Sequence, residues 1–404
     1  MPDQNHFITL DDISLSGKRV LVRVDFNVPM ENGNILDYTR IQASLPTIKQ
    51  IIKNNGRVII MSHLGRPKEG KFKESCSLLP VANALSTLIG EDVKFVSNWD
   101  RINEETTRRI ILLENVRFNV GETSNDENLS RLMASICDIY VNDAFAAAHR
   151  SHASTHGVAK YVPIACAGPL MVKEMDALSR AFNKPEHPLI AIVGGSKIST
   201  KLKVLKSLLE KVDKLIVGGG IANTFLKATG INIGKSLCED NLLVTANEII
   251  ELANKQNKEI PLPVDVICGK SVDKKAEALI KPIDNIADDD LILDIGPQTA
   301  SNYKTELLSA KTIIWNGPLG VFEIDQFAKG TEALGKAIAQ SSAFSVAGGG
   351  DTLSAISKFN IGADISYITT AGGAFLEFLE GKTLPAIAIL EECALAWHAT
   401  EKEN

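Results

Sequence analysis

The sequence predicts an α/β protein made of two doubly wound parallel-sheet (Rossmann-like) domains joined by an interdomain helix. Three observations support this prediction. Short runs of β-branched and apolar residues recur along the chain, helix-favouring segments lie between most of them, and 404 residues suit two or three domains. Strands this apolar are covered on both faces, which is typical of parallel sheets with crossover helices.

The predicted strands fall into two series. The first series consists of "RVLVRV" from Arg19, "RVIIMS" from Arg57, "DVKFV" from Asp92, "IILL" from Ile110 and "DIYV" from Asp138. The second consists of "PLIAIVGG" from Pro188, "KLIVGGG" from Lys214, "PLPVDVI" from Pro261, "TIIWNG" from Thr312, "AFSVAGGG" from Ala343 and "SYITT" from Ser366. We interpret each series as the parallel sheet of one domain.

Two helical patterns complete the predicted organisation. In "STKLKVLKSLLEKV", residues 199–212, the apolar residues form one stripe and lysines populate the other face, as in a crossover helix. Residues 169–188, "PLMVKEMDALSRAFNKPEHP", have a helical pattern stopped by prolines and no strand signal. We therefore expect an N-terminal domain at 1–168, an interdomain helix and hinge at 169–187, a C-terminal domain at 188–389 and a C-terminal segment at 390–404.

Composition restricts the class of protein. A net charge of -6 argues against a general polyanion binder, although it allows a local basic site. The six cysteines show no CxxC and no metal-like spacing, so we expect reduced thiols in a cytosolic protein. The N-terminus lacks a basic region followed by an apolar one, and no apolar run reaches the ~18 residues of a membrane span. We predict a cytoplasmic protein without a membrane partner.

Glycine-rich turns follow the strands of the second half. "VGGSK", "VGGGIAN", "WNGPLG", "VAGGGDT" and "TTAGGAF" all lie at or just after predicted strand ends. Glycine lets backbone N–H groups approach a phosphate, and the N-terminus of a following helix favours the same anion. Each turn on its own also fits an ordinary tight connection, but five at one sheet edge indicate a nucleotide. No GxGxxG follows a strand, and "GRPKEGKF" and "GINIGKS" both fail the Walker A pattern.

Charged residues near these turns extend the nucleotide interpretation. Lys197 and Lys201 lie four residues apart beside a diglycine, so they can share one helical face and neutralise phosphates. Lys201 also fits the solvated lysine face of the following helix. The Asp351 carboxylate is a suitable ligand for a magnesium ion that is also bound by phosphate oxygens. Asp351 fits equally well as the N-cap of the helix that follows the glycines.

The first half carries cations just past its strand ends. They are Arg23, Arg40, His63, Arg66, Arg117, His149 and Arg150. The guanidinium fork matches phosphate and carboxylate oxygens, so we interpret this group as one anion pocket. Zinc is an alternative ligand for His149, His152 and His156, although no companion cysteine or carboxylate accompanies them.

Asp25 and Asn27 alternate with Arg23 in "RVDFNVP", so we expect all three to project from one face of a strand. A carboxylate beside phosphate-binding arginines accepts a hydrogen bond from a hydroxyl, which favours a ligand with both phosphate and hydroxyl groups. Asp25 fits equally as the salt-bridge partner of a neighbouring arginine.

Eight motifs, in this order, closely resemble those of the phosphoglycerate kinase family: "RVDFNVP", "SHLGRP", "ENVRF", "VNDAFAAAHRSHAS", "VGGSK", "VGGGIANTFLK", "WNGPLGVFE" and "GGGDT". The resemblance covers essentially the whole chain. It implies reversible phosphoryl transfer between 1,3-bisphosphoglycerate and magnesium ADP, giving 3-phosphoglycerate and magnesium ATP, in a monomeric, hinge-bending enzyme of glycolysis. It also implies that the C-terminal segment packs back on the N-terminal domain.

The resemblance implies three groups of site residues. Those for the acid are Asp25, Phe26, Asn27, Arg40, His63, Leu64, Gly65, Arg66, Arg117 and Arg150. Those for the nucleotide are Lys201, Gly219, Asn316, Pro318, Glu323, Gly349, Gly350, Asp351 and Thr352, with Glu323 at the ribose and Asp351 at the magnesium ion. Arg40, Lys197 and Lys201 would stabilise charge on the transferred group. No general base is needed, because the attacking carboxylate is already ionised.

The sequence departs from the commoner family wording at four positions. Ala146 and Ala147 stand where Gly-Thr is usual, Thr200 where an Asp is common, and Ala371 where a third glycine is frequent. The charged ligand set is intact, so we expect activity to be retained with altered energetics of domain closure.

Other function classes share some of these sequence features. A nucleic-acid binder would show a basic stripe with interleaved aromatics, and this chain has 5% aromatics and a negative net charge. A different sugar-acid kinase or a non-enzymatic nucleotide-binding module stays open. One cationic and one glycine-rich domain favour transfer.

Overall fold

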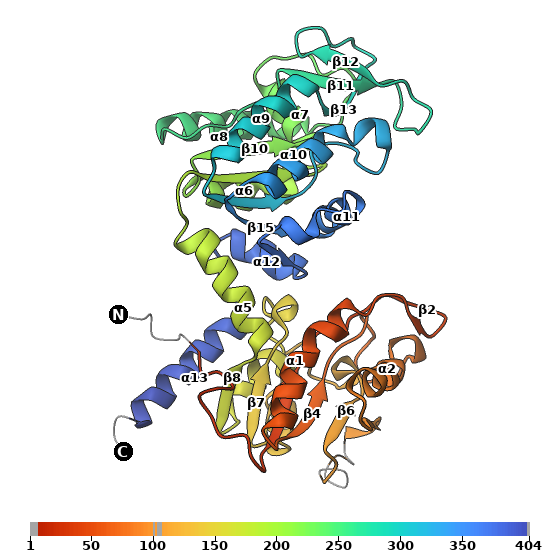
Figure 1. Ribbon diagram of the computed structural model, residues 1–404, viewed down its shortest axis with the longest axis vertical. Helices are drawn as coiled ribbons and strands as arrows, with labels where there is room; N and C mark the ends of the chain where they lie inside the picture. Colours follow the sequence, from red (N-terminus) through yellow and green to blue (C-terminus); the bar gives the residue numbers. More distant parts are fainter. Residues whose placement is uncertain (1–6, 100–101, 103–106, 402–404) are drawn as a thin grey trace. The chain divides into compact units, whose positions relative to one another are not determined.

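The computed structural model describes residues 7–99, 102 and 107–401. The chain forms two compact units (Figure 1): unit 1 is Met1–Met175 with Thr383–Asn404, and unit 2 is Asp176–Lys382. One boundary falls inside helix α5 (Pro169–Leu178), and the other falls just before helix α13 (Pro385–Glu401). The first boundary lies within the predicted interdomain helix at 169–187, whereas the second lies before residue 390, where the C-terminal segment is predicted to begin.

Unit 1 is built on a parallel sheet in the order β5-β6-β4-β1-β7-β8. Its strands are β1 (Arg19–Arg23), β4 (Arg57–Met61), β5 (Lys94–Val96), β6 (Ile110–Leu113), β7 (Ile139–Asn142) and β8 (Ile164–Ala167). All the predicted strands of the first series form. The short, alanine-containing β8 and the hairpin of β2 (Met30–Glu31) and β3 (Asn34–Ile35) were not predicted.

The main helices of unit 1 have local sequence reasons to begin and end where they do. They are α1 (Thr39–Lys53), α2 (Leu79–Ile89), α4 (Glu127–Ser135) and α13. A proline opens α2 and the left-handed Gly90 ends it, while the Asp126 side chain accepts a hydrogen bond from the Leu129 N–H at the start of α4. The C-terminal helix α13 packs against β8, and Ala394 joins the hydrophobic core of this unit.

Unit 2 contains a parallel sheet in the order β10-β9-β14-β15-β16. These strands are β9 (Leu189–Gly194), β10 (Lys214–Gly218), β14 (Thr312–Asn316), β15 (Phe344–Gly348) and β16 (Tyr367–Thr369). The predicted strand after Pro261 is β11 (Asp265–Gly269), but it lies in a separate antiparallel sheet with β12 (Leu279–Pro282) and β13 (Leu291–Ile295). The expectation that every strand of the second series belongs to one parallel sheet was therefore wrong.

The helices of unit 2 are α6 (Leu202–Leu209), α7 (Gly219–Ala228), α8 (Leu243–Lys255), α9 (Pro297–Ser309), α10 (Lys329–Gln340), α11 (Gly350–Lys358) and α12 (Gly372–Leu379). The predicted helix at 199–212 is shorter, because a turn of 3-10 helix (Ile198–Thr200) precedes α6. The segment predicted as the interdomain helix consists of α5 followed by a π-helical turn (Ser179–Asn183), which agrees with its helical pattern. A core around Trp315 and Tyr303 joins the parallel sheet to α9 and α10.

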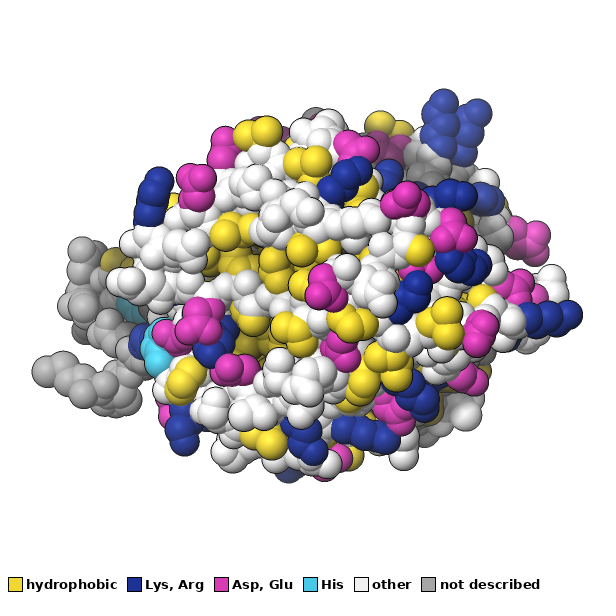
Figure 2. All heavy atoms as spheres, turned by 90° about the horizontal axis from the view of Figure 1, so that it is seen from above, with side chains coloured by type: hydrophobic (Ala, Val, Ile, Leu, Met, Phe, Trp, Pro, Cys, Tyr) yellow, Lys and Arg dark blue, Asp and Glu magenta, His cyan; other side chains and the backbone are white. Residues whose placement is uncertain are grey.

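Lysine and arginine side chains are interspersed with aspartate and glutamate on the face seen in Figure 2, and hydrophobic side chains gather near its centre. All six cysteines are free thiols. Within residues 7–99, 102 and 107–401, none of the helices has the length and apolarity required to cross a bilayer. The parallel sheets and the helices between their strands confirm the predicted α/β fold class.

Candidate active site

The predicted acid-binding residues follow the carboxyl ends of neighbouring strands in unit 1. Strand β1 pairs with β4 on one side and β7 on the other, so the strand order reverses there. Ligands of doubly wound sheets bind outside the carboxyl ends at such a reversal. The loop after β1 carries Asp25 and Asn27, and the loop after β4 carries His63 and Arg66. Arg150 follows β7.

Arg23 lies at the base of this region. Its side chain is only 1% exposed, and its guanidinium contacts the Nδ1 atom of His63 at 3.1 Å. Its Nε atom donates to the Ser154 hydroxyl at 3.0 Å, and its Nη1 atom donates to the carbonyl oxygen of Val24. The sequence pattern groups Arg23 with the predicted anion ligands. These contacts instead make Arg23 a buried partner of His63.

Asp25 and Arg40 form an ion pair at 2.5 Å, and both side chains are partly buried. Asp25 also accepts a hydrogen bond from the backbone N–H of Asn27 at 3.0 Å. Strand β1 ends at Arg23, so Asp25 and Asn27 belong to the loop that follows it. The expectation that the three residues share one strand face was wrong, and the salt-bridge interpretation of Asp25 is what the structure shows.

The segment 63–66 is held by backbone contacts. Asn27 accepts the Gly65 N–H at 2.8 Å, Arg117 donates to the Gly65 carbonyl oxygen, and Asn115 donates to the Leu64 carbonyl oxygen at 2.7 Å. Gly65 has φ +62°, a conformation that favours glycine. The side chains of Phe26 and Leu64 are buried in the hydrophobic core. These two residues can therefore serve a ligand only through their backbone.

The cations of this region repel one another. Burial, followed by the charges of Arg66 and Arg23, lowers the pKa of Arg150. Burial, followed by the charges of Arg23, Arg150 and Arg40, holds the pKa of His63 well below its ordinary value, so this imidazole is neutral. Arg66 is exposed, whereas Arg117 is buried. An anion that enters this region relieves the repulsion, which suits a phosphorylated acid.

The zinc alternative has no structural support in the described residues. Among residues 7–99, 102 and 107–401, no three His, Cys, Asp or Glu side chains lie close enough together to hold a metal ion. A π-helical turn at Ala153–Gly157 replaces the α-helix that would align the three histidines. Instead, His152 lies 3.6 Å from Glu122, and His156 contacts Asn125 at 3.1 Å.

Lys201 is held at the carboxyl ends of β9 and β14 in unit 2. Its Nζ atom donates to the Gly194 carbonyl oxygen at 2.7 Å and to the side-chain and backbone oxygens of Asn316 at 2.6 and 3.2 Å. Burial lowers the pKa of Lys201 to about 8. Lys201 therefore lies away from the solvated lysine face of α6. Lys197 is exposed, and a 3-10 turn separates it from Lys201, so the two lysines do not share an α-helical face.

The glycine-rich turn that begins α11 packs on the same asparagine. Asn316 donates to the Gly348 carbonyl oxygen at 2.7 Å, and Thr352 accepts the Gly317 N–H at 2.7 Å. Gly349 has φ +101°, and a Cβ atom there would lie 2.7 Å from the Asn316 amide nitrogen. The conformation and the close approach both require glycine at this position. At Gly350, in contrast, nothing lies within 4 Å of an added Cβ atom.

Asp351 is exposed in the first turn of α11, where Gly349 is the N-cap and no side chain caps the helix. The N-cap interpretation of Asp351 was therefore wrong. Its negative charge raises the pKa of Lys201 against the larger effect of burial, which places the two groups near each other. The Asp351 carboxylate is exposed and makes no capping hydrogen bond, so it is available to bind a cation that is also bound by phosphate oxygens.

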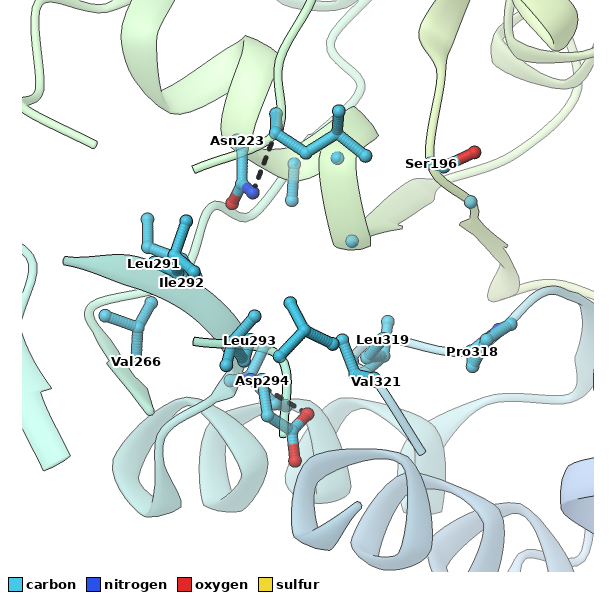
Figure 3. A pocket seen from close by; sticks show the side chains of 18 of the residues that line it. Ser196, Asn223, Val266, Leu291, Ile292, Leu293, Asp294, Pro318, Leu319 and Val321 are labelled. Carbon is cyan, nitrogen blue, oxygen red and sulfur yellow. Dashed lines mark hydrogen bonds between the residues drawn. The ribbon is translucent and has the colours of Figure 1, made fainter. Parts of the chain in front are cut away.

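A cavity of about 470 Å³ adjoins these turns (Figure 3). Gly219, Pro318, Glu323 and Asp351 are among its lining residues. Leu293, Leu319 and Val321 give it apolar walls. It joins an apolar pocket to glycine turns and charged groups within one unit. A base and ribose with attached phosphates need this combination.

Asp294 also lines the cavity, but Figure 3 shows its carboxylate pointing away from the open space. It accepts the Gly330 N–H at 2.6 Å and the Ile295 N–H at 2.9 Å. Burial raises the pKa of Asp294 to about 8. Sequence reasoning missed this residue. An aspartate in the apolar run "LILDIG" is not by itself a signal, because its partner Gly330 comes from a distant segment of the chain.

The four departures from the family wording fall at ordinary positions. Thr200 donates its hydroxyl to the Lys197 carbonyl oxygen at 2.8 Å, and Ala371 is the buried N-cap of α12. Ala146 and Ala147 lie in a 3-10 turn after β7. None of them displaces the charged side chains described above.

Comparison with known proteins identifies the family. The family model for phosphoglycerate kinase matches residues 10–382. A phosphoglycerate kinase structure from Coxiella burnetii is 52% identical, with a TM-score of 0.91, over 96% of this chain and 99% of that one. One from Pyrococcus horikoshii OT3 is 34% identical, with a TM-score of 0.79 and the same coverage. The resemblance inferred from the motifs is thus confirmed: the chain belongs to the phosphoglycerate kinase family, glycolytic enzymes that transfer a phosphoryl group between a nucleotide and the carboxyl group of a phosphoglycerate.

Proposed function

We propose that unit 1 binds 3-phosphoglycerate or 1,3-bisphosphoglycerate through Arg40, His63, Arg66, Arg117 and Arg150. Asp25 would accept a hydrogen bond from the hydroxyl group of the ligand, and Asn27 would hold the backbone of Gly65 in place. The repulsion of Arg150 by Arg66 and Arg23, and the effect of Arg23, Arg150 and Arg40 on the pKa of His63, support the assignment, because a phosphorylated acid supplies the missing negative charge. The ion pair with Asp25 orients the Arg40 guanidinium. The positive charges of the other arginines are not neutralised by this pair. Phe26, Leu64 and Gly65 contribute backbone groups.

In unit 2 we assign the apolar cavity to the base and ribose, with Gly219, Pro318 and Glu323 in its wall. The phosphates would meet the turn at Gly349–Thr352 and the Lys201 ammonium, which Asn316 orients. Asp351 would hold magnesium together with phosphate oxygens, because its carboxylate is exposed and unused by the helix. Magnesium, when bound, would neutralise charge on the nucleotide phosphates.

Transfer needs no proton-accepting side chain, because the attacking or leaving carboxylate is ionised at neutral pH. Arg40, Lys197 and Lys201 would stabilise negative charge on the transferred phosphoryl oxygens. Since the acid and the nucleotide are assigned to different units, transfer requires a conformation in which the two ligands meet. Hinge bending near residues 169–187 is the motion that we propose, and it would also protect the acyl phosphate from water.

The observation that carries this assignment is the clustering of His63 with Arg23, Arg40 and Arg150 in one unit and of Lys201, Asn316 and the Gly349 turn in the other. A coupled assay of ATP formation from 1,3-bisphosphoglycerate and ADP, with and without magnesium, tests it. A non-enzymatic nucleotide-binding module would bind ADP without turnover, and a different sugar-acid kinase would require another acid. A monomeric state, a cytoplasmic location and the lack of a nucleic-acid partner stay predictions.

A further inference from the structure

A buried chain of hydrogen bonds connects Glu122 to His63 in unit 1. The Ser154 hydroxyl donates to Oε1 of Glu122 at 2.6 Å, and the Ser154 N–H donates to Oε2 at 3.0 Å. The same hydroxyl accepts a hydrogen bond from Nε of Arg23 at 3.0 Å, and Nη2 of Arg23 lies 3.1 Å from Nδ1 of His63. Glu122 and Ser154 are fully buried and belong to none of the predicted site residues.

The chemistry of arginine fixes the direction of the last contact. A guanidinium has five donors and no acceptor, so Nδ1 of His63 must accept this hydrogen bond. His63 is neutral, so its single proton is then on Nε2. The nearest carboxylate oxygen, Oδ1 of Asp25, lies 3.9 Å from Nδ1, too far to take a proton from it in a hydrogen bond.

Glu122 accounts for the position of Arg23. Burying a guanidinium is costly unless an opposite charge and hydrogen-bond acceptors accompany it. Burial lowers the pKa of Arg23, and Glu122 is the first of the groups that raise it again, ahead of Asp25. Because the Ser154 hydroxyl gives its proton to Glu122, its lone pairs face Arg23, which can then aim its other nitrogen at His63.

We infer that Glu122 is a positioning residue that acts through Ser154 and Arg23 to hold His63 as the Nε2–H tautomer. The imidazole is thereby a hydrogen-bond donor at Nε2, as an anionic ligand requires. This last consequence rests on the proposed function, in which His63 contacts the phosphorylated acid. The tautomer itself is a property of the protein without ligand.

The test is nitrogen NMR of the full chain with ¹⁵N-labelled histidine, with His63 assigned by His63→Gln. In the unmodified protein we expect Nδ1 to show the chemical shift of an unprotonated nitrogen and Nε2 that of a protonated one. Ser154→Ala and Glu122→Gln should both give a mixture of the two tautomers. The matched control is Glu127→Gln, which removes an exposed carboxylate of the same unit and should leave the spectrum unchanged.

Kinetics provide a second readout. In Ser154→Ala and Glu122→Gln, the KM for 3-phosphoglycerate should rise roughly tenfold, the scale of one lost hydrogen bond to a charged group, while the KM for ATP stays unchanged. Ser154→Ala is the milder change and keeps the test valid if Glu122→Gln fails to fold. A protonated Nδ1 in the unmodified protein, or an unchanged tautomer in a folded Ser154→Ala variant, overturns the inference. If instead the tautomer shifts but His63→Gln leaves the KM for the acid unchanged, the positioning chain stands and the acid-binding role of His63 fails.

Discussion

The ammonium nitrogen of Lys201 lies 2.6 Å from the side-chain oxygen of Asn316, at the point where β14 ends. The same asparagine donates its amide to the Gly348 carbonyl oxygen at the end of β15. Asn316 therefore links the lysine assigned to the phosphates with the glycine turn assigned to them. Because the acceptors around Lys201 are neutral oxygens, burial prevails and its pKa falls to about 8.

We predict that this low pKa appears in the pH dependence of nucleotide use. In the free enzyme Lys201 loses its proton as the pH rises through about 8, so kcat/KM for the nucleotide should fall there. Bound phosphates favour the charged ammonium, so the corresponding fall in kcat should lie at higher pH. Lys201→Arg keeps the charge and should remove the fall in kcat/KM, while Lys206→Arg, an exposed lysine in α6, should leave it in place. A fall that persists in Lys201→Arg would belong to another group.

Arg40→Ala should cripple turnover and leave ADP binding nearly normal, because Arg40 belongs to unit 1. The variant also leaves the partly buried Asp25 carboxylate without its partner, where it would repel the acid. Loss of such a partner costs ~2–5 kcal/mol, whereas an exposed pair contributes ~0–1 kcal/mol. Steady-state kinetics and calorimetry of ADP binding measure the two effects. Arg109→Ala, which breaks an exposed pair with Glu91, is the control, and equal loss of ADP affinity in Arg40→Ala would refute the assignment.

Asp351→Asn should raise the magnesium concentration needed for half-maximal turnover and change stability little. The carboxylate makes no capping hydrogen bond, so only its interaction with the helix dipole is lost, ~0.3–1 kcal/mol. Magnesium titrations of the variant and of Asp364→Asn, a surface change in the same unit, should differ. Identical titrations would leave Asp351 without a metal role.

Gly349→Ala should weaken nucleotide binding and lower the free energy of unfolding by ~1–3 kcal/mol, because φ is +101° and the new Cβ atom would meet the Asn316 amide. Displacing that amide also removes an oxygen partner of Lys201. Gly372→Ala is the matched control, since nothing lies within 4 Å of its added Cβ atom. Thermal unfolding with and without ADP separates the two effects, and equal behaviour of both variants would contradict the argument.

Local patterns in the sequence predict most strands and the place of the charged residues, because strand ends and glycine turns leave a direct signal. They could not predict the antiparallel sheet of β11, β12 and β13, since a strand's partners depend on tertiary packing rather than on its own residues. The same limit applies to Glu122 and Asp294. In the sequence, an aspartate or glutamate that will be buried cannot be distinguished from an exposed one. Its partners, such as Ser154 or Gly330, come from distant segments that only the fold brings together.

The last prediction concerns motion of the two units. The acid is assigned to residues of unit 1 and the nucleotide to residues of unit 2, and α5 crosses from one unit to the other. A ligand shifts a conformational equilibrium only through contacts that differ between its states, so neither ligand alone has reason to favour a closed form. Small-angle scattering should show the largest decrease in radius of gyration in the ternary complex of 3-phosphoglycerate and a nonreactive nucleotide analogue with magnesium.

The radius of gyration of the binary complexes should stay close to that of the free protein. Arg40→Ala should lose the decrease seen in the ternary complex while it keeps nucleotide binding. An identical radius of gyration in free, binary and ternary samples of active enzyme would rule out hinge bending at residues 169–187.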